Sequence, residues 1–304
     1  MKLAVEFPNV SYREGSGAVQ RLARAIEDIG YDQLDMFDHV VMGFPNERRQ
    51  APMYPPKMPI LEALMTLSFI ASATSRIGLG TEVLVLPQRQ PVMVARQIAT
   101  LDTLSDGRVR LGVGVGWQKA EFDALGEDYT TRGKRMDDAI RLLRACWQDE
   151  KIAFTSPHYN LDDIAMEPKP PQGGNLPIWI GGGSKRALRR VGELGDGWLA
   201  TGMHDEAMVA QAISDIHQHA ERTGRDPAAI GLQMMLDVPP RDNAGKTFYS
   251  DLDQVARRAV AIKEMGFGWA TINATAIFQS GARSVDAIIE SLGRIHERLR
   301  QELG

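Results

Sequence analysis

The sequence predicts one α/β domain over residues 1–304, folded as a single (β/α)8 TIM barrel. Three observations lead to this fold. Short apolar stretches alternate with amphipathic helical patterns, eight such units can be counted, and no change of composition marks a second domain. This alternation is typical of parallel strands joined by crossover helices. Barrels of this kind reach about 300 residues as one domain.

The first and last units show the pattern most clearly. An apolar strand at 3–7 precedes a helix that should end at Gly30, and a strand at 269–272 precedes a helix that Ser284 should cap. Helical spacing places these apolar residues on the buried faces: Val19, Leu22, Ile26 and Ile29 in the first helix, and Val285, Ile288, Leu292, Ile295 and Leu299 in the last. The strands between are expected near 33–37, 76–86, 108–115, 177–181, 196–201 and 230–238.

Two segments interrupt the alternation. Residues 40–59, rich in proline, form a long loop after the second strand and are expected to act as a lid on the catalytic face. Residues 150–176 precede the fifth strand and predict an inserted hairpin or extended excursion. Both are loops within the barrel and not domain linkers, because apolar periodicity resumes after each.

Composition excludes several classes of protein. A net charge of -4 gives no broad basic field, so neither nucleic acid nor a membrane is expected as a partner. The expected partner is a small-molecule substrate. Cys146 has no second cysteine to pair with, and the start of the chain, interrupted by Glu6 and Pro8, does not resemble a signal peptide. We therefore expect a cytoplasmic protein.

In this fold, active sites lie where the strands end at their carboxyl side. Polar or glycine-rich positions expected there are Asn9, Asp38, His39, Glu82, Trp117 and Gly181 to Ser184. His39 should stand at the mouth of the second strand, where an imidazole can give or take a proton near neutral pH. A structural or solvated histidine is the alternative.

A glycine-rich turn follows the fifth strand. Residues 178–184 lead through Gly181, Gly182 and Gly183 to Ser184, at the start of a helix that also carries Lys185 and Arg186. Backbone N–H groups and the positive helix start favour an anion at such a place, so we expect a phosphate site. A tight turn without a ligand is the alternative.

Other chemistry-bearing patterns are weaker. Gly112, Gly114 and Gly116 lack the Rossmann spacing, and they either leave room under a flat ring or fill the barrel core. His217 and His219 point to different faces of a helix, so no metal site is expected. Cys146 lacks a catalytic context and no lysine lies at a strand end. A bound cofactor is therefore expected to carry the chemistry.

The motifs together resemble the luciferase-like family of flavin- and deazaflavin-dependent oxidoreductases. The resemblance spans nearly the whole chain and rests on ordered matches. These are residues 31–39, 76–84, 91–108, 112–117, Glu121-Phe122, 177–183 and 195–198.

The resemblance implies a redox cofactor, coenzyme F420 or alternatively FMN, at the carboxyl ends of the strands. It implies a non-proline cis peptide at Glu82-Val83 behind the ring, with His39 as the catalytic residue beside the reactive face, and a homodimer. The implied cofactor-binding residues are Asp38, Thr81, Glu82, Val83, Gly114, Gly116, Gly181, Gly182, Gly183 and Ser184. The substrate pocket would comprise Asn9, Phe44, Tyr54 and Trp117, with Phe278 and Arg283 nearby.

One position departs from the family pattern. Sugar-phosphate dehydrogenases of the deazaflavin branch carry a glutamate where this chain has Trp117, so glucose 6-phosphate is a poor expectation and an apolar or aromatic substrate a better one. The function expected first is hydride transfer with F420, and the function expected second is that of an FMN-dependent monooxygenase. A non-redox isomerase, with Glu82 as its weak candidate base, and a cofactor-free binding protein are the remaining alternatives.

Overall fold

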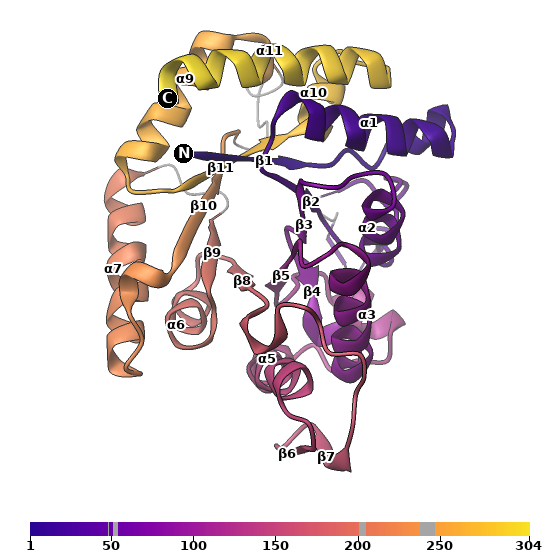
Figure 1. Cartoon of the computed structure of the whole chain (residues 1–304), viewed down its shortest axis with the longest axis vertical. Coiled ribbons are helices and arrows are strands. Elements are labelled where there is room, and N and C mark those ends of the chain that lie inside the picture. Colours follow the sequence, from indigo (N-terminus) through magenta and orange to yellow (C-terminus); the bar gives the residue numbers. More distant parts are fainter. Residues whose placement is uncertain (48, 51–53, 201–204, 238–246) are drawn as a thin grey trace.

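A closed ring of parallel strands forms the centre of the computed structural model, which describes residues 1–47, 49–50, 54–200, 205–237 and 247–304 (Figure 1). Eight positions close the ring, because β3 pairs with both β2 and β5. In chain order the strands are β1 (Lys2–Glu6), β2 (Gln33–Met36), β3 (Gly78–Thr81) with β4 (Leu84–Val85), β5 (Val109–Gly114), β8 (Ile178–Gly181), β9 (Gly197–Ala200), β10 (Gly231–Met235) and β11 (Trp269–Asn273). The predicted TIM barrel is confirmed.

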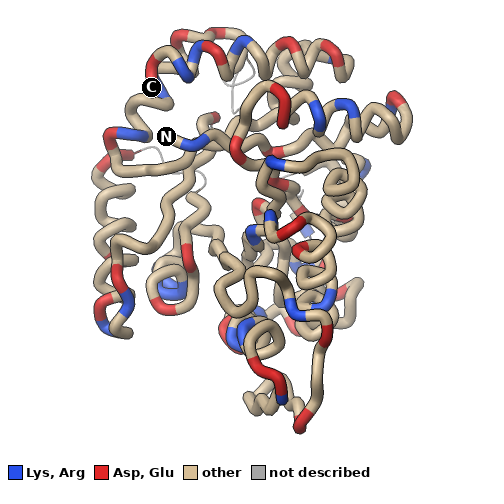
Figure 2. Tube along the Cα trace, in the orientation of Figure 1, with Lys and Arg blue, Asp and Glu red and all other residues tan. Residues whose placement is uncertain are grey.

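Helices follow the strands and cover the outside of the ring. They are α1 (Ser16–Ile29), α2 (Ala63–Ala71), α3 (Pro91–Leu104), α5 (Arg132–Gln148), α6 (Lys185–Leu194), α7 (Glu206–Arg222), α9 (Leu252–Glu264) and α11 (Val285–Leu303). The predicted ends are confirmed: Gly30 closes α1 in the left-handed conformation, and the Ser284 hydroxyl accepts a hydrogen bond from the Ala287 N–H. Figure 2 shows acidic and basic residues interleaved along outer helices such as α11.

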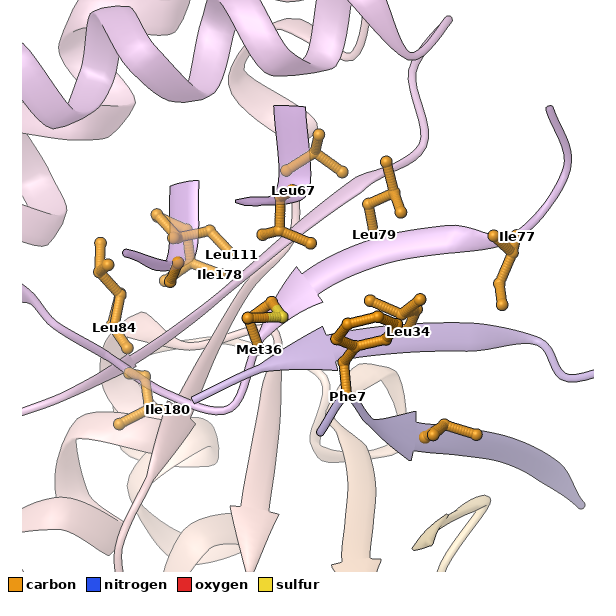
Figure 3. Close-up of a cluster of buried hydrophobic side chains, with 14 of the residues drawn as sticks. Phe7, Leu34, Met36, Leu67, Ile77, Leu79, Leu84, Leu111, Ile178 and Ile180 are labelled. Carbon is orange, nitrogen blue, oxygen red and sulfur yellow. The ribbon is translucent and has the colours of Figure 1, made fainter. Parts of the chain in front are cut away.

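The main apolar core lies between the ring and the helices. Strand residues that point outward, such as Val5, Leu34 and Leu79, are fully buried against helix residues such as Leu67. Figure 3 shows part of this layer, with Phe7, Leu34, Met36 and Leu79 close together. Burial on this face explains why alternate strand positions are apolar.

The inside of the ring is polar. Glu6, Asp35, Glu82, Arg110, Gln233 and Thr271 are buried there. Arg110 donates to Asp35 over 2.7 Å, and its guanidinium lies 4.4 Å and 4.8 Å from the ring centroids of Trp179 and Trp269. Such stacking stabilises a buried cation. The Trp179 ring fits because a Cβ on Gly197 or Gly231 would lie within 2.3 Å of it.

Of the two segments expected to interrupt the barrel, 150–176 is fully described and 40–59 only in part. An antiparallel hairpin of β6 (Ile152–Thr155) and β7 (Asn160–Ile164) precedes β8, which confirms the excursion (Figure 1). Residues 48 and 51–53 of the expected lid lie outside the described residues. In the described remainder of 40–59, an isolated bridge joins Asn46 to Arg49. Positions 201 and 238 of the expected strands also lie outside the described residues.

Candidate functional site

His39 lies at the end of β2 and is held by a residue from a distant part of the chain. Its Nδ1 lies 3.1 Å from Oε2 of Glu121, which belongs to the short helix α4 (Lys119–Ala124) after β5. The other Glu121 oxygen accepts the backbone N–H of Val40. Glu121 is fully buried and His39 is 8% exposed. The pair therefore forms a shielded unit at the barrel mouth.

Hydrogen bonding decides the charge of Glu121. Burial alone would raise the pKa of this carboxyl, but hydrogen bonds from His39, Val40 and Val41 lower it below its ordinary value. An ionised Glu121 favours the His39 tautomer that carries its proton on Nδ1, which leaves Nε2 for exchange with a ligand. In the sequence Glu121 stood out only as part of the family pattern, because 82 residues separate it from His39.

Aromatic side chains surround the His39 ring. The ring centroids of Tyr54 and Trp117 lie 5.6 Å and 5.4 Å from it, both edge to face. Phe37 lies 5.9 Å from Tyr54. Two of the four residues expected in the substrate pocket are thus brought together. This set of His39, Tyr54, Trp117 and Phe37 is called the ring cluster below.

The other two expected pocket residues have different surroundings. Phe44 is 60% exposed, and no described residue makes a ring contact with it. Asn9 is buried; its Oδ1 accepts the Leu61 N–H over 2.9 Å, while its Nδ2 has no partner among the described residues. The structure therefore joins Asn9 to the 40–62 connection and leaves Phe44 at the surface.

A break in the third strand lies beside the end of β2, where the Glu82 N–H donates to the Met36 carbonyl over 2.8 Å. The Glu82-Val83 peptide is cis, as the resemblance implied. The Thr81 hydroxyl donates to the Gly112 carbonyl over 2.6 Å and so joins β3 to β5 below the break. A Cβ on Gly114 or Gly181 would lie 2.5 Å or 2.8 Å from the Val83 side chain. Gly114 and Gly181 therefore leave room for the Val83 side chain. For the stretch Gly112 to Gly116, the contact at Gly114 supports the interpretation that these glycines allow the barrel core to be filled.

Asp38, next to His39, has protein partners for both oxygens. Arg89 donates to Oδ1 over 2.8 Å and the Val85 N–H donates to Oδ2 over 3.0 Å. Burial raises the pKa of Asp38 despite the nearby Arg89 charge. Gly116, whose φ is +75°, makes room for Val85 and Phe122. Both residues thus fix the backbone around the break in the third strand.

The glycine turn after β8 has the features expected of an anion site. Gly182 adopts φ +111°, Ser184 caps α6 by accepting the Ala187 N–H over 3.2 Å, and Gly183 to Arg186 are exposed. No described acid pairs with Lys185 or Arg186. The helix start, the Ser184 hydroxyl and two cations fit a phosphate group.

Three acids meet inside the mouth; sequence reasoning singled out Glu82 but missed Glu6 and Asp237. Glu6 ends β1, Glu82 lies at the break in the third strand, and Asp237 follows β10; each is at most 8% exposed. Burial raises the pKa of Glu6, that of Glu82 to about 8 and that of Asp237 to about 6. The Tyr249 hydroxyl donates to Asp237 over 2.7 Å. Glu6, Glu82 and Asp237 are called the acid cluster below.

A family model described as luciferase-like monooxygenase matches residues 3–269. The chain belongs to this family. It is 28% identical over 212 residues to an F420-dependent glucose-6-phosphate dehydrogenase of Kineococcus radiotolerans, which covers 66% of this chain and 62% of that protein. It is 32% identical over 195 residues to an FMNH2-dependent dimethylsulfone monooxygenase of Pseudomonas fluorescens, which covers 63% of this chain and 52% of the relative.

Another relative is an F420-dependent hydroxymycolic acid dehydrogenase of Mycobacterium tuberculosis, 29% identical over 242 residues, or 78% of this chain and 63% of that one. Among solved structures, the monooxygenase RslO1 of Streptomyces bottropensis has a TM-score of 0.81 at 17% identity with full coverage of both chains. An F420-dependent secondary alcohol dehydrogenase has a TM-score of 0.79 at 18% identity, covering 98% and 99%. These structures support the fold.

Two searches of the described residues bear on other classes of site. No described helix is both long and apolar enough to span a bilayer. Within the same residues, no group of three histidine, cysteine or acidic side chains is placed to hold a metal ion. His217 and His219 both lie on α7, and His219 faces Glu193 at 3.6 Å.

Proposed function

We propose that this protein is an F420-dependent oxidoreductase that transfers a hydride to or from a small organic substrate. The observation that carries the proposal is the buried His39–Glu121 pair at the barrel mouth. A hydride transfer to or from a carbonyl or alcohol needs a group that gives or takes one proton. His39 is placed to be that group.

The residues of the mouth fit a phosphorylated tricyclic cofactor. The cofactor phosphate would lie against Gly182, Gly183, Ser184 and Lys185, and the ring against the backbone of Glu82 and Val83. When bound, the deazaflavin supplies or accepts the hydride. Thr81, Asp38, Gly114, Gly116 and Gly181 then act mainly by fixing that backbone, through the contacts described above.

The protein's own residues manage the proton. Glu121 holds the Nδ1–H of His39, so Nε2 can take a proton from a substrate alcohol or return it to a carbonyl. The rings of Tyr54 and Trp117 shield the imidazole from water and offer an apolar wall to the substrate. The substrate is therefore proposed to have an apolar or aromatic part.

An FMN-dependent monooxygenase is the second candidate. It is favoured by the match to a relative that uses FMNH2 at 32% identity, higher than the 28% of the glucose-6-phosphate dehydrogenase. Both cofactors carry a phosphate on a ribityl chain, so the start of α6 suits either one. A non-redox isomerase or a cofactor-free binding protein would bind neither.

Titration of the purified protein with F420, FMN and FAD tests the proposal. We expect saturable quenching of deazaflavin fluorescence and weaker binding of the two flavins. Lys185→Ala should weaken F420 binding, whereas Lys134→Ala on α5 is the control. Tight FMN binding without any F420 binding would replace the proposal by the monooxygenase, and binding of no cofactor would favour the two remaining alternatives.

We also propose a homodimer and a cytoplasmic location. Exposed apolar side chains lie on the neighbouring helices α2 and α3: Met65 is 72% exposed, Met93 58% and Phe69 40%. The α2 sequence Ala63–Ala71 has no charged residue, so it suits contact with a second copy. Light scattering should give twice the chain mass for the protein and the chain mass for Met65→Glu.

The proposed cytoplasmic location rests on Cys146, a buried free thiol, which suits a reducing compartment.

A further inference from the structure

Glu6 is a buried acid without a polar partner among the described residues. It ends β1, its side chain points into the ring by strand alternation, and it is 8% exposed. No residue in the described part of the chain donates a hydrogen bond to its carboxyl or forms an ion pair with it, and its oxygens are not among the fully enclosed unpaired atoms, so they remain accessible from the mouth. A buried polar group without a partner costs free energy, so such a group in a barrel mouth points to a ligand.

The charged groups that act on Glu6 are mostly of its own sign. Glu82, Asp237 and Asp35 all interact with it electrostatically and raise its pKa further, after burial. Arg110 lies near Glu82 and lowers its pKa; its Nη2 donates to Asp35 and its guanidinium stacks on Trp179 and Trp269, while its Nη1 is buried without a hydrogen-bond partner. Among the described residues, the acids of this cluster therefore outnumber the cations near them.

Tyr54 connects the acid cluster to the ring cluster. Its ring lies 5.6 Å from that of His39 and 6.4 Å from that of Trp117. After burial, the charges of Glu6 and Asp237 raise the pKa of its hydroxyl to about 12. Faces of tyrosine and tryptophan attract cations, most strongly where water is excluded. Carboxylates and electron-rich rings thus meet at the same place.

We propose that Glu6 and Asp237, together with the rings of Tyr54 and Trp117, bind the cationic nitrogen of the substrate. The substrate would be a small apolar or aromatic molecule that carries an alkylammonium or another protonated amine. This inference rests on the proposed function, because it specifies the substrate of the same mouth, but it depends on residues other than His39, Glu121 and the α6 start.

The proposal implies a specific dependence on pH. Because burial raises the pKa values of these acids, the acid cluster should hold at least one proton near neutral pH when no cation is bound. A bound cation favours the ionised form, so binding should release protons and should strengthen as pH rises from 5.5 to 8. Within the described ranges, the other groups that face the cluster are Asp35, Arg110, Tyr54, Tyr249 and Asn273.

Two probes of the same shape, one charged and one neutral, distinguish the effect of charge on binding from the effect of shape. Benzyltrimethylammonium and its carbon analogue neopentylbenzene would be titrated into the purified protein by calorimetry, without F420 and with saturating F420. We expect the cation to bind at least tenfold more tightly than the neutral analogue, with proton release at pH 7 that depends on the buffer used. Equal affinities would overturn the proposal.

Variants assign the preference to residues. Glu6→Gln should reduce the preference for the cation about tenfold, or about 1.4 kcal/mol, and Asp237→Asn should also reduce it. Glu221→Gln on the exposed side of α7 should leave it unchanged. Circular dichroism would establish that each variant folds. A preference that survives both Glu6→Gln and Asp237→Asn would overturn the proposal, while F420 binding, measured separately, would still report on the proposed function.

Discussion

Two groups of buried carboxyls lie at the same barrel mouth and differ in charge. Glu121 accepts hydrogen bonds from His39, Val40 and Val41, and its pKa is lowered. Glu6 and Glu82 are also buried, but they interact with other acids, and their pKa values are raised. Glu82 accepts a hydrogen bond from Gln233 over 3.2 Å, yet its pKa still rises. The balance between donors and neighbouring negative charges therefore sets the direction of each pKa shift.

This contrast assigns different roles to the two sides of the mouth. On the β2 side, an ionised Glu121 orients His39 for proton transfer. On the β1 and β10 side, the acid cluster is proposed to bind a cationic group of the substrate. Removal of one group at a time should therefore affect the two sides differently.

Replacement of the imidazole tests the β2 side most strongly. His39→Ala should lower kcat by roughly 10²- to 10⁴-fold, because general acid–base catalysis contributes about that much. F420 affinity should change little, since His39 is not proposed to touch the phosphate. Rapid-mixing kinetics and fluorescence titration measure the two quantities. Turnover at the wild-type rate would exclude His39 as the proton-transfer group.

Neutralising its partner should have a smaller effect. Glu121→Gln retains the shape of the side chain but removes the charge, so kcat should fall roughly tenfold to a hundredfold. Asp123→Asn, on the exposed face of the same helix α4, is the matched control. A kcat equal to that of the wild type would mean that Glu121 does not support proton transfer by His39.

The acid cluster should make stability depend on pH. Because the pKa of Glu82 is raised to about 8 in the folded protein, the folded state binds more protons than the unfolded state above pH 4.5. Stability should therefore fall as pH rises from 5 to 8. Thermal unfolding of Glu82→Gln should show a smaller fall, whereas the exposed Glu297→Gln should follow wild type. An unchanged fall in Glu82→Gln would show that Glu82 does not titrate there.

Two serine caps with the same geometry separate stability from cofactor binding. The Ser184 and Ser284 hydroxyls each accept a backbone N–H over 3.2 Å. Either alanine variant should cost about 0.5–2 kcal/mol of stability. Ser184→Ala should in addition weaken F420 binding about tenfold, because it loses a phosphate donor. Equal F420 affinity in the two variants would remove Ser184 from the cofactor site.

Much of the fold followed from periodicity. Helical spacing placed Leu22 and Leu292 in the core, and the alternation of strands and helices placed His39 at a strand mouth, because both patterns are local. The hairpin before β8 also followed from a local break in that rhythm. The cis peptide at Glu82-Val83 came from the family resemblance and not from residue spacing.

The missed residues depend on contacts between distant segments. Nothing local links Glu121 to His39, since the ring closure that joins β2 to β5 brings them together. Glu6 lies in a strand that reads as apolar, and only the closed ring shows that it faces Glu82 and Asp237. The glycines at 114 and 181 were visible, but their partner Val83 was not.

The state of the His39 ring tests the central claim most directly. Nitrogen-15 NMR of histidine-labelled protein, assigned with His39→Ala and recorded at a pH where the ring is neutral, distinguishes the two tautomers. We predict a proton on Nδ1, held by Glu121, and a free Nε2. A proton on Nε2 would contradict the account, because Glu121 would then not hold His39 in the state required for proton transfer.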